Sequence, residues 1–242
     1  MTLYEFWENV NYVSGRFPNG GAITPERLNT IFSLVSGEYF ADCLKRSDMD
    51  ALMPFRKTRG EGTAPLTTTD GTATLPDDYY VGAAGYYGAD NRMIEFVGDG
   101  EWVRRVGHAI EYPTEKYPLA KIQGGEVHVR PKTVNHIKFS YLRKPETPYM
   151  DYCIDATNPA RVVYMPTGSE VVGGELKQGG TVLESNVLTK DGETGTYQSQ
   201  TVEIEWPEQV HWKLVYLVLQ KAGVNLSEQL VLQYAMEKEG GK

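Results

Sequence analysis

The sequence predicts an α+β fold: N- and C-terminal helices forming a small bundle, a central antiparallel β-sandwich or small β-barrel, and an extended Gly-rich hairpin region. Three observations predict this fold. Apolar residues recur at helical spacing in the first 45 residues. Short runs of alternating apolar and polar residues fill the middle of the chain. A segment near residue 210 is apolar on every side if helical, so other helices must cover it.

These observations divide the 242-residue chain into three parts. Residues 1–55 and 206–242 are expected to form the helical bundle, and residues 56–160 the central β domain. Residues 161–205 are expected to form a Gly-rich β-hairpin or arm that contacts another subunit. A chain of this length can bury a sizeable core without disulfides or metals.

Two amphipathic helices are expected at the N-terminal end. The first has apolar residues spaced i, i+3, i+4 and i+7 within residues 3–10. The second starts at Thr24-Pro25-Glu26, which supplies a cap, a proline for the first turn and an acidic residue. Its apolar stripe continues to about Lys45. Gly37 weakens its middle by ~1 kcal/mol relative to alanine.

The segment Pro207–Lys221 is the expected centre of the bundle. Pro207 suits the first helical position, where its missing N–H costs nothing. The segment is shorter than the ~20 apolar residues that cross a bilayer, so no membrane span is expected. A last amphipathic helix should follow a capping box that starts at Asn225.

Short strands are expected in the middle of the chain. Residues 93–97 alternate, and a further strand is expected at Glu101–Val106 after a turn. Glu126–Arg130 and Ile137–Tyr141 alternate on either side of a short polar turn, which favours a hairpin. The polar segment Arg56–Asp70 has little periodicity and is interpreted as an extended arm or loop.

The region after the central domain is poor in large apolar residues. Prolines in Arg143–Asn158 favour a connector without regular strands. Residues 161–205 are rich in Gly, Thr and Ser, and Asp191-Gly192 is a tight-turn signal. Because such a segment buries little by itself, we expect a protruding hairpin whose contacts come from a neighbouring subunit.

No catalytic, cofactor or metal site is predicted. The four histidines lack zinc-site spacing, and no phosphate-binding loop is present. The two cysteines, Cys43 and Cys153, form no metal-like pattern and are expected to be free thiols in a reducing compartment. The pair Asp77-Asp78 could bind a divalent cation or act in acid–base chemistry. A turn is the favoured interpretation, because Pro76 precedes the pair and strand neighbours point to opposite faces.

The charge balance argues against a protein that binds nucleic acid. The formal net charge is −8, whereas proteins that hold nucleic acid present a basic face. The N-terminal residues MTLYEFWENV lack the basic and apolar regions of a secretory signal, so none is expected.

Three stretches resemble a known family. They are TLPDDYY (74–80), YPLAKIQGGEVHVRPKT (117–133) and IKFSYLRKPETPYMD (137–151). Their order and spacing are similar to those of the ring, or head-to-tail adaptor, proteins of crAss-like podoviral tailed phages. The resemblance covers roughly residues 1–160 and 200–240, and the Gly-rich segment 165–200 is where it fails.

This resemblance implies a non-enzymatic structural protein of the virion. Such adaptors assemble in the host cytoplasm into a ring, usually twelve-fold, beneath the portal protein, where they join capsid to tail. The implied partners are further copies of the chain, the portal, and other ring or tail proteins. Genomic DNA passes through the lumen without specific binding, and an acidic wall would avoid trapping its phosphates.

A closed ring requires two different complementary faces on each subunit. The expected contact regions are the Gly-rich hairpin, the polar arm and the final helix. The candidate interface residues are Trp212, Tyr216, Leu230, Tyr234, Val171, Val172 and Asp191.

Two other functions remain open. One is a carbohydrate- or receptor-binding β-module of a phage tail, because abundant Tyr and Trp suit sugar stacking. Helices at both ends and the lack of a fibre-like repeat count against it. The other is a hydrolase that uses Asp77 and Asp78, for which the sequence gives little support.

Overall fold

The computed structural model describes residues 1–15, 22–60, 63–190 and 192–224. The fold is α+β, as predicted, and the chain forms two compact units. We call Met1–Pro54 together with Pro145–Lys242 the terminal unit, and Phe55–Lys144 the inserted unit. The chain therefore returns to the terminal unit at Pro145, whereas the central β domain was expected to extend to residue 160.

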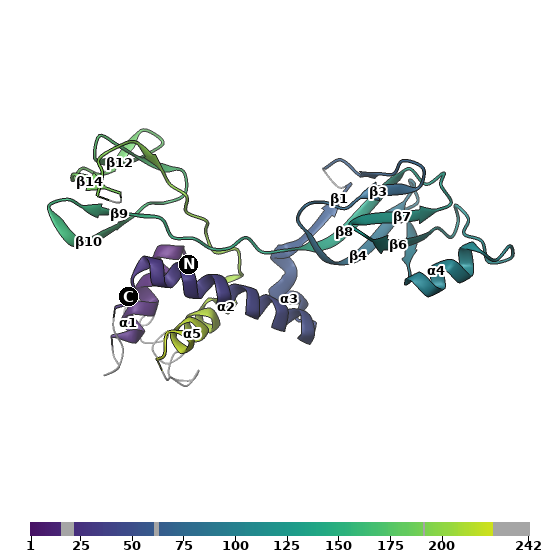
Figure 1. Cartoon of the computed structure of the whole chain (residues 1–242), viewed down its shortest axis with the longest axis horizontal. Helices are drawn as coiled ribbons and strands as arrows, with labels where there is room; N and C mark the ends of the chain where they lie inside the picture. The colour runs from purple at the N-terminus through teal and green to yellow at the C-terminus, as the bar shows by residue number, and fades with distance from the viewer. Residues whose placement is uncertain (16–21, 61–62, 191, 225–242) are drawn as a thin grey trace. The chain divides into compact units, whose positions relative to one another are not determined.

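The helices of the terminal unit form the expected bundle. They are α1 (Leu3–Ser14), α2 (Pro25–Arg46), α3 (Met49–Leu52) and α5 (His211–Lys221), with 3-10 turns η1 (Met53–Phe55) and η2 (Glu208–Val210). Thr24 caps α2 as predicted, because its side chain accepts a hydrogen bond from the Arg27 N–H. Helix α5 contacts both α1 and α2, which lie beside it in Figure 1. The predicted last helix lies outside the described residues.

Helix α5 buries one face more completely than the other. Leu214, Val215, Val218 and Leu219 are fully buried, whereas Trp212, Tyr216 and Leu217 are half-buried. Pro207 is not in the first turn of α5, contrary to expectation. It precedes the 3-10 turn in an extended conformation (ψ 149°), and α5 begins only at His211.

Two small sheets complete the terminal unit. Their strands are β9 (Tyr152–Asp155), β10 (Asn158–Tyr164), β11 (Ser169–Val172), β12 (Glu175–Gln178), β13 (Thr181–Glu184), β14 (Leu188–Thr189) and β15 (Tyr197–Gln198). The strand orders are β10-β9-β14 and β13-β12-β11-β15 (Figure 1).

These sheets correct two expectations about residues 143–205. Strand β9 lies within Arg143–Asn158, the expected connector. A strand can form there because Pro145 and Pro148 both precede Tyr152. The Gly-rich segment also buries apolar side chains within its own unit. Its core comprises Cys153, Met165, Val171, Leu176 and Leu188.

The inserted unit is one curled, half-barrel sheet of eight strands in the order β1-β8-β4-β5-β6-β7-β3, with β2 also paired to β8 (Figure 1). The strands are β1 (Arg56–Arg59), β2 (Leu66–Thr67), β3 (Thr72–Thr74), β4 (Tyr79–Tyr87), β5 (Arg92–Phe96), β6 (Leu119–Gln123), β7 (Glu126–Arg130) and β8 (His136–Arg143). All pairs are antiparallel except β5 with β6. The sheet encloses a core that includes Ile94, Ala120, Val127, Val129, Ile137, Phe139 and Tyr141.

The predicted hairpin between β7 and β8 is wrong. Strand β7 pairs with β6 and β3, and β8 pairs with β1, β2 and β4. The hairpin partner of β7 is β6, because Gly124 and Gly125 both adopt positive φ and provide a tight turn between them. The polar segment Arg56–Asp70 is also no free arm, since β1 and β2 lie in the sheet.

The strand predicted at Glu101–Val106 is a helix, α4 (Asp99–Val106). Glu101 and Arg104 form an i, i+3 ion pair with a 2.7 Å separation, which suits a helix. Trp102 is 8% exposed and lies against Lys121 of β6 and Arg130 of β7, each 5.6 Å from its ring centroid. Trp102 thus helps to hold α4 against the sheet, together with the ion pairs of Arg105 with Glu95 and of Asp99 with Lys121.

Candidate functional site

The predicted interface residues occupy different environments. Trp212 and Tyr216 are half-buried on α5, and the Lys213 ammonium lies 5.2 Å from the Tyr216 ring centroid. Val171 is fully buried in the core of the small sheets, and Val172 is half-buried. The other three candidates, Leu230, Tyr234 and Asp191, lie outside the described residues. A role for these residues between subunits stays a prediction.

Asp77 and Asp78 lie in a turn, as the sequence predicts. Asp77 is exposed. The Asp78 carboxylate accepts hydrogen bonds from Lys57 Nζ at 2.5 Å and Tyr141 Oη at 2.6 Å. Burial raises the pKa of Asp78, but the hydrogen bonds from Lys57 and Tyr141 outweigh it and lower the pKa overall. Asp78 thus ties the start of β4 to β1 and β8.

The described residues contain no group of three or more His, Cys, Asp or Glu side chains placed to hold a metal ion. Cys43 and Cys153 are buried free thiols. Burial raises the pKa of both thiols, that of Cys153 to about 11. A thiol with a raised pKa is rarely a thiolate near neutral pH and is a poor nucleophile.

His211 at the start of α5 is the buried histidine. Its Nε2–H donates to the Trp206 carbonyl at 2.8 Å. Its Nδ1 is the one buried side-chain polar atom without a partner among the residues that the structure describes. Burial lowers the pKa of His211, and the charge of the N-terminal ammonium lowers it further. The ring is therefore held neutral within the bundle.

A polar pocket of about 530 Å³ lies beside α2 in the terminal unit. Asp151 is 1% exposed, and its two carboxylate oxygens lie 2.8 and 2.9 Å from Lys190 Nζ. The same oxygens accept the backbone N–H groups of Tyr152 and Gln200. The side chain of Tyr152 donates to Glu26 of α2. These groups satisfy one another, so the cluster joins the small sheets to α2.

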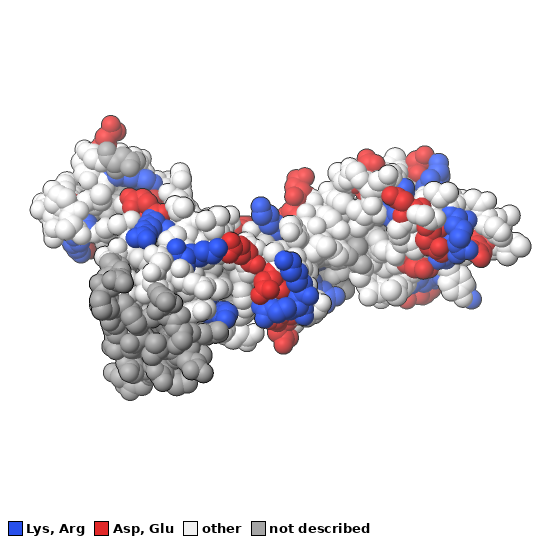
Figure 2. Space-filling view, turned by 60° about the horizontal axis from the view of Figure 1, so that its bottom comes forward, with Lys and Arg blue, Asp and Glu red and all other residues white. Residues whose placement is uncertain are grey.

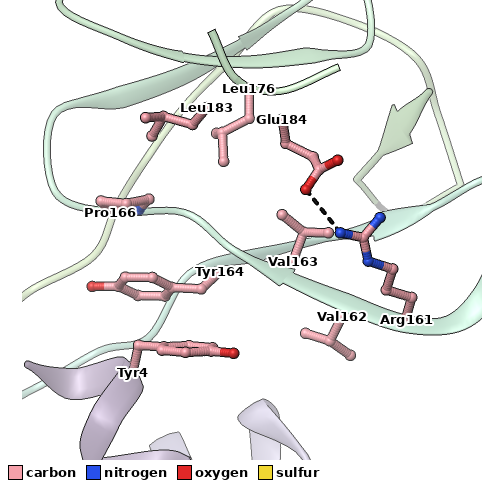
Figure 3. Close-up of a pocket in the computed structure, with 9 residues that line it drawn as sticks. All are labelled: Tyr4, Arg161, Val162, Val163, Tyr164, Pro166, Leu176, Leu183 and Glu184. Carbon is pink, nitrogen blue, oxygen red and sulfur yellow. Dashed lines mark hydrogen bonds and ion pairs between the residues drawn. The ribbon is translucent and has the colours of Figure 1, made fainter. Parts of the chain in front are cut away.

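The second pocket of interest, the Tyr4–Tyr164 pocket, has a volume of about 310 Å³ and is lined by both polar and apolar side chains (Figure 3). Its lining residues are Tyr4, Arg161, Val162, Val163, Tyr164, Pro166, Leu176, Leu183 and Glu184. The rings of Tyr4 and Tyr164 stack with centroids 5.5 Å apart. Tyr164 donates to Glu203, which fixes its ring in this position.

Two unpaired strand edges flank this pocket. Strands β10 and β13 are each outermost in their sheets. Arg161 of β10 points toward Glu184 of β13 in Figure 3, with 2.8 Å between Nη2 and Oε2. An ion pair thus closes one side of the pocket, and the two tyrosines and several aliphatic side chains form the rest.

The inserted unit carries a group of exposed apolar side chains on α4, β5 and the segment that follows α4. We call residues 107–117 the Ile110 loop. Ile110 is 89% exposed, Tyr117 65% and Tyr112 46%. Val103 of α4 and Met93 of β5 are also largely exposed. Contiguous exposed apolar patches mark interaction sites, whereas single exposed apolar side chains are common on protein surfaces.

The Ile110 loop is held at several points. Arg104 Nη1 of α4 lies 2.6 Å from Glu111 Oε2. Arg92 of β5 donates to the Glu115 carbonyl at 3.4 Å, and within the loop the Tyr117 N–H donates to the Thr114 carbonyl at 3.0 Å. Ile110 therefore lies on a loop that α4 and β5 both contact.

Charges of both signs are interspersed on the face that Figure 2 shows. Arg104 pairs with Glu101 and Glu111, and Arg161 pairs with Asp155 and Glu184. Because carboxylates neutralise these cations within the chain, they do not form a basic surface for phosphates. This agrees with the net charge of −8.

No protein-family model matches the chain, and no curated protein matches it. Within the ranges that the structure describes, no helix has the length and apolar character needed to cross a bilayer.

Sequence reasoning missed both the Ile110 loop and the Tyr4–Tyr164 pocket. The signal for the loop is weak, since Ile110 and Tyr112 stand in an aperiodic segment between α4 and β6. The pocket has no local signal, because its lining residues come from residues 4, 161–166 and 176–184.

Proposed function

We propose that the protein is a non-enzymatic, ring-forming head-to-tail adaptor of a crAss-like podoviral tailed phage. In the virion it would lie beneath the portal, join capsid to tail and form part of the DNA exit channel. The observation that best supports an assembly role is the high exposure of several large apolar side chains on α4, β5 and the Ile110 loop.

Exposed apolar surface favours association. Burying one large aliphatic or aromatic side chain is worth roughly 1.5–3 kcal/mol relative to leaving it in water. Ile110, Tyr117, Met93 and Val103 are all more than 60% exposed. A neighbouring subunit could cover these side chains, whereas a monomer leaves them in water.

The resemblance to adaptor proteins supports the same role. The stretch TLPDDYY (74–80) leads from β3 into β4, and residues 137–151 begin within β8 and continue past its end. The acidic balance suits a channel wall, because like charge avoids trapping the phosphate backbone.

Mass photometry and negative-stain microscopy test the proposal. The purified protein, alone and mixed with the portal protein of the same phage, should form closed rings. Ile110→Asp should shift the population toward monomers without changing the far-ultraviolet circular dichroism, because Ile110 makes little contact within its own chain. A protein that stays monomeric with the portal and binds glycans on an array would instead support the tail-module alternative.

A further inference from the structure

We propose that the curled sheet of the inserted unit binds the phosphate group of a small molecule, on the face opposite its core. The site is a pocket of about 320 Å³, which we call the Arg56–Lys138 pocket. Its lining residues are Arg56, Thr58, Tyr86, Asn91, Lys138 and Ser140. This inference goes beyond the adaptor role and does not depend on it.

Strand alternation places Lys138 and Ser140 on the face opposite the core. Ile137, Phe139 and Tyr141 of β8 lie in the core, and the two residues between them therefore point the other way. Strands β1 and β4 lie on either side of β8 (Figure 1). Side chains from three neighbouring strands thus meet on this face.

Small side chains at the centre of this face leave room for a pocket. Ser140 of β8 is in register with Thr58 of β1 on one side and with Ala84 of β4 on the other. Two residues further along the same strands, Lys138 is in register with Tyr86. A row of three small residues therefore lies beside two long side chains, which form a wall of the pocket.

The two cations of the pocket have no carboxylate partner among the residues that the structure describes. The Arg56 Nε–H donates to Ser140 Oγ at 3.3 Å, and Lys138 Nζ donates to Asn91 Oδ1 at 2.8 Å. Both acceptors are neutral, so neither positive charge is compensated there. The arginines of α4 and β10 differ, because each is paired with carboxylates.

The carboxylates on the strands and turns near the pocket are held by other cations. The pairs are Asp78 with Lys57, Asp90 with Arg92, and Glu95 with Arg105. These carboxylates therefore do not offset the charges of Arg56 and Lys138. The pocket presents two positive charges on a chain whose net charge is −8, and an anionic ligand would compensate them.

The pocket has further hydrogen-bond donors. Ser140 is 6% exposed, and its Oγ accepts from both Arg56 Nε and Thr58 Oγ1, the latter at 3.1 Å. Its own hydroxyl hydrogen is left to donate. The Arg56 Nη groups and the remaining Lys138 ammonium protons add more donors. A phosphate group, with three or four oxygens, can use more of these donors than a carboxylate can with two.

The Lys138 side chain is held in place at two points. A Cβ at Gly60 would lie 2.8 Å from Lys138 Cγ, so the bare backbone of Gly60 packs directly against the lysine stem. Asn91 holds the ammonium group at the other end. A side chain held in this way loses less conformational freedom when a ligand binds, which favours affinity.

The volume of the pocket sets the size of the ligand. A cavity of roughly 150 Å³ is sufficient for a benzene-sized group. A pocket of about 320 Å³ therefore has room for a phosphate group and for part of the molecule that carries it. The Tyr86 side chain, 38% exposed, could contact that part.

Titration calorimetry of the full chain with inorganic phosphate tests the site. One phosphate should bind per chain at pH 7.5 and low salt. Arg56→Gln and Lys138→Gln should each weaken binding at least tenfold, because each removes one of the two uncompensated charges. Ser140→Ala should weaken it at least threefold. Absence of phosphate binding to the unmodified protein would overturn the proposal.

Lys116→Gln is the matched control, because it removes the same charge from an exposed position outside the pocket. It should leave the affinity for phosphate within twofold. Equal weakening by Lys116→Gln and Arg56→Gln would show non-specific attraction and overturn the site. Thermal unfolding without phosphate checks that the variants fold, and added phosphate should raise the melting temperature of the unmodified protein alone.

Two other ligands test the chemical class. Acetate should bind at least tenfold more weakly than phosphate, and equal affinities would refute the assignment to phosphate. A ten-nucleotide thymidine oligonucleotide tests the source of the phosphate. If it bound in an Arg56-dependent way and inorganic phosphate did not bind, the small-molecule assignment would be wrong. Closed rings without phosphate binding would refute this site and leave the adaptor role intact.

Discussion

The curled sheet of the inserted unit and the small sheets of the terminal unit are stabilised in different ways. In the curled sheet, Phe139 packs against Tyr141, Tyr79 and Phe96 with ring centroids 5.5–6.1 Å apart. Among the described residues, the core of the small sheets has one aromatic ring packed against it, that of the half-buried Tyr197. The small sheets instead bury the carboxylates of Asp151 and Asp155, each with several hydrogen-bond donors.

This difference has a physical consequence. Apolar packing tolerates small shifts because it is non-directional, whereas a buried carboxylate is costly unless every lone pair has a partner. We therefore expect the curled sheet to be most sensitive to loss of side-chain volume. The small sheets should be most sensitive to loss of a single charged group.

The largest effect is expected for Phe139→Ala in the curled sheet. Phe139 is 0% exposed, and truncation of such a residue costs about 3–5 kcal/mol through lost burial and the cavity left behind. Hydrogen exchange of the β4 and β8 amides should accelerate accordingly. Met93→Ala, at a 71% exposed position on β5, should change stability by no more than about 0.5 kcal/mol. Similar effects for both variants would contradict the apolar account of this sheet.

Asp151→Asn tests whether buried, hydrogen-bonded carboxylates stabilise the small sheets. Breaking a buried ion pair costs about 3–5 kcal/mol, and we expect about 2–3 kcal/mol because Lys190 keeps partial contact with water. The β9 and β14 amides should lose protection in hydrogen exchange, while those of β8 should not. Glu175→Gln removes a half-exposed pair with Lys177 and serves as the control. If the two variants were equally stable, the buried pair of Asp151 with Lys190 would not stabilise the small sheets as we expect.

His211 should make the stability of the helical bundle depend on pH. Burial lowers its pKa in the folded chain, so below the unfolded value of about 6.5 the unfolded chain binds a proton that the folded chain does not. Stability is retained above that value and falls as pH decreases, by at most about 1.4 kcal/mol per pH unit. Urea unfolding measured from pH 7.5 to 5.5 gives the free energy of unfolding at each pH. That free energy should depend less steeply on pH in His211→Gln, because glutamine cannot be protonated.

The smallest change in stability is expected for Gly37→Ala in α2. Unlike the other variants, it should make the protein more stable. A Cβ at this exposed position meets no atom within 4 Å, so alanine should stabilise the helix by about 0.5–1 kcal/mol. Gly71→Ala is the contrasting variant, because Gly71 has φ +76° and its Cβ would lie 2.7 Å from the Val129 carbonyl oxygen. Thermal unfolding should show stabilisation by the first and destabilisation by the second.

Local patterns in the sequence predicted the two N-terminal helices, α1 and α2. The cap at Thr24 and the apolar stripe to Lys45 define α2 to within one residue of its observed end. The fold class followed from these helices and from alternating strands such as β5 and β7. These elements could be predicted because each carries its signal within ten to twenty neighbouring residues.

Strand pairing and the candidate site could not be predicted in the same way. Strands β7 and β8 look like a hairpin because they are adjacent and both alternate, but their partners are chosen by the whole sheet. Helix α4 has only eight residues, too few to separate a helical from an alternating pattern. The Tyr4–Tyr164 pocket exists only after segments more than 150 residues apart come together.

The pairing of β1 with β8 has a consequence for how this chain could evolve. Arg56 and Leu142 are register partners, so the first and last strands of the inserted unit run side by side. Paired residues of antiparallel strands lie roughly 5 Å apart, and the place where the polypeptide enters the module is therefore also where it leaves. A gene segment encoding residues 55–144 could thus be exchanged or deleted as one block, with a short turn to rejoin the flanking sequence.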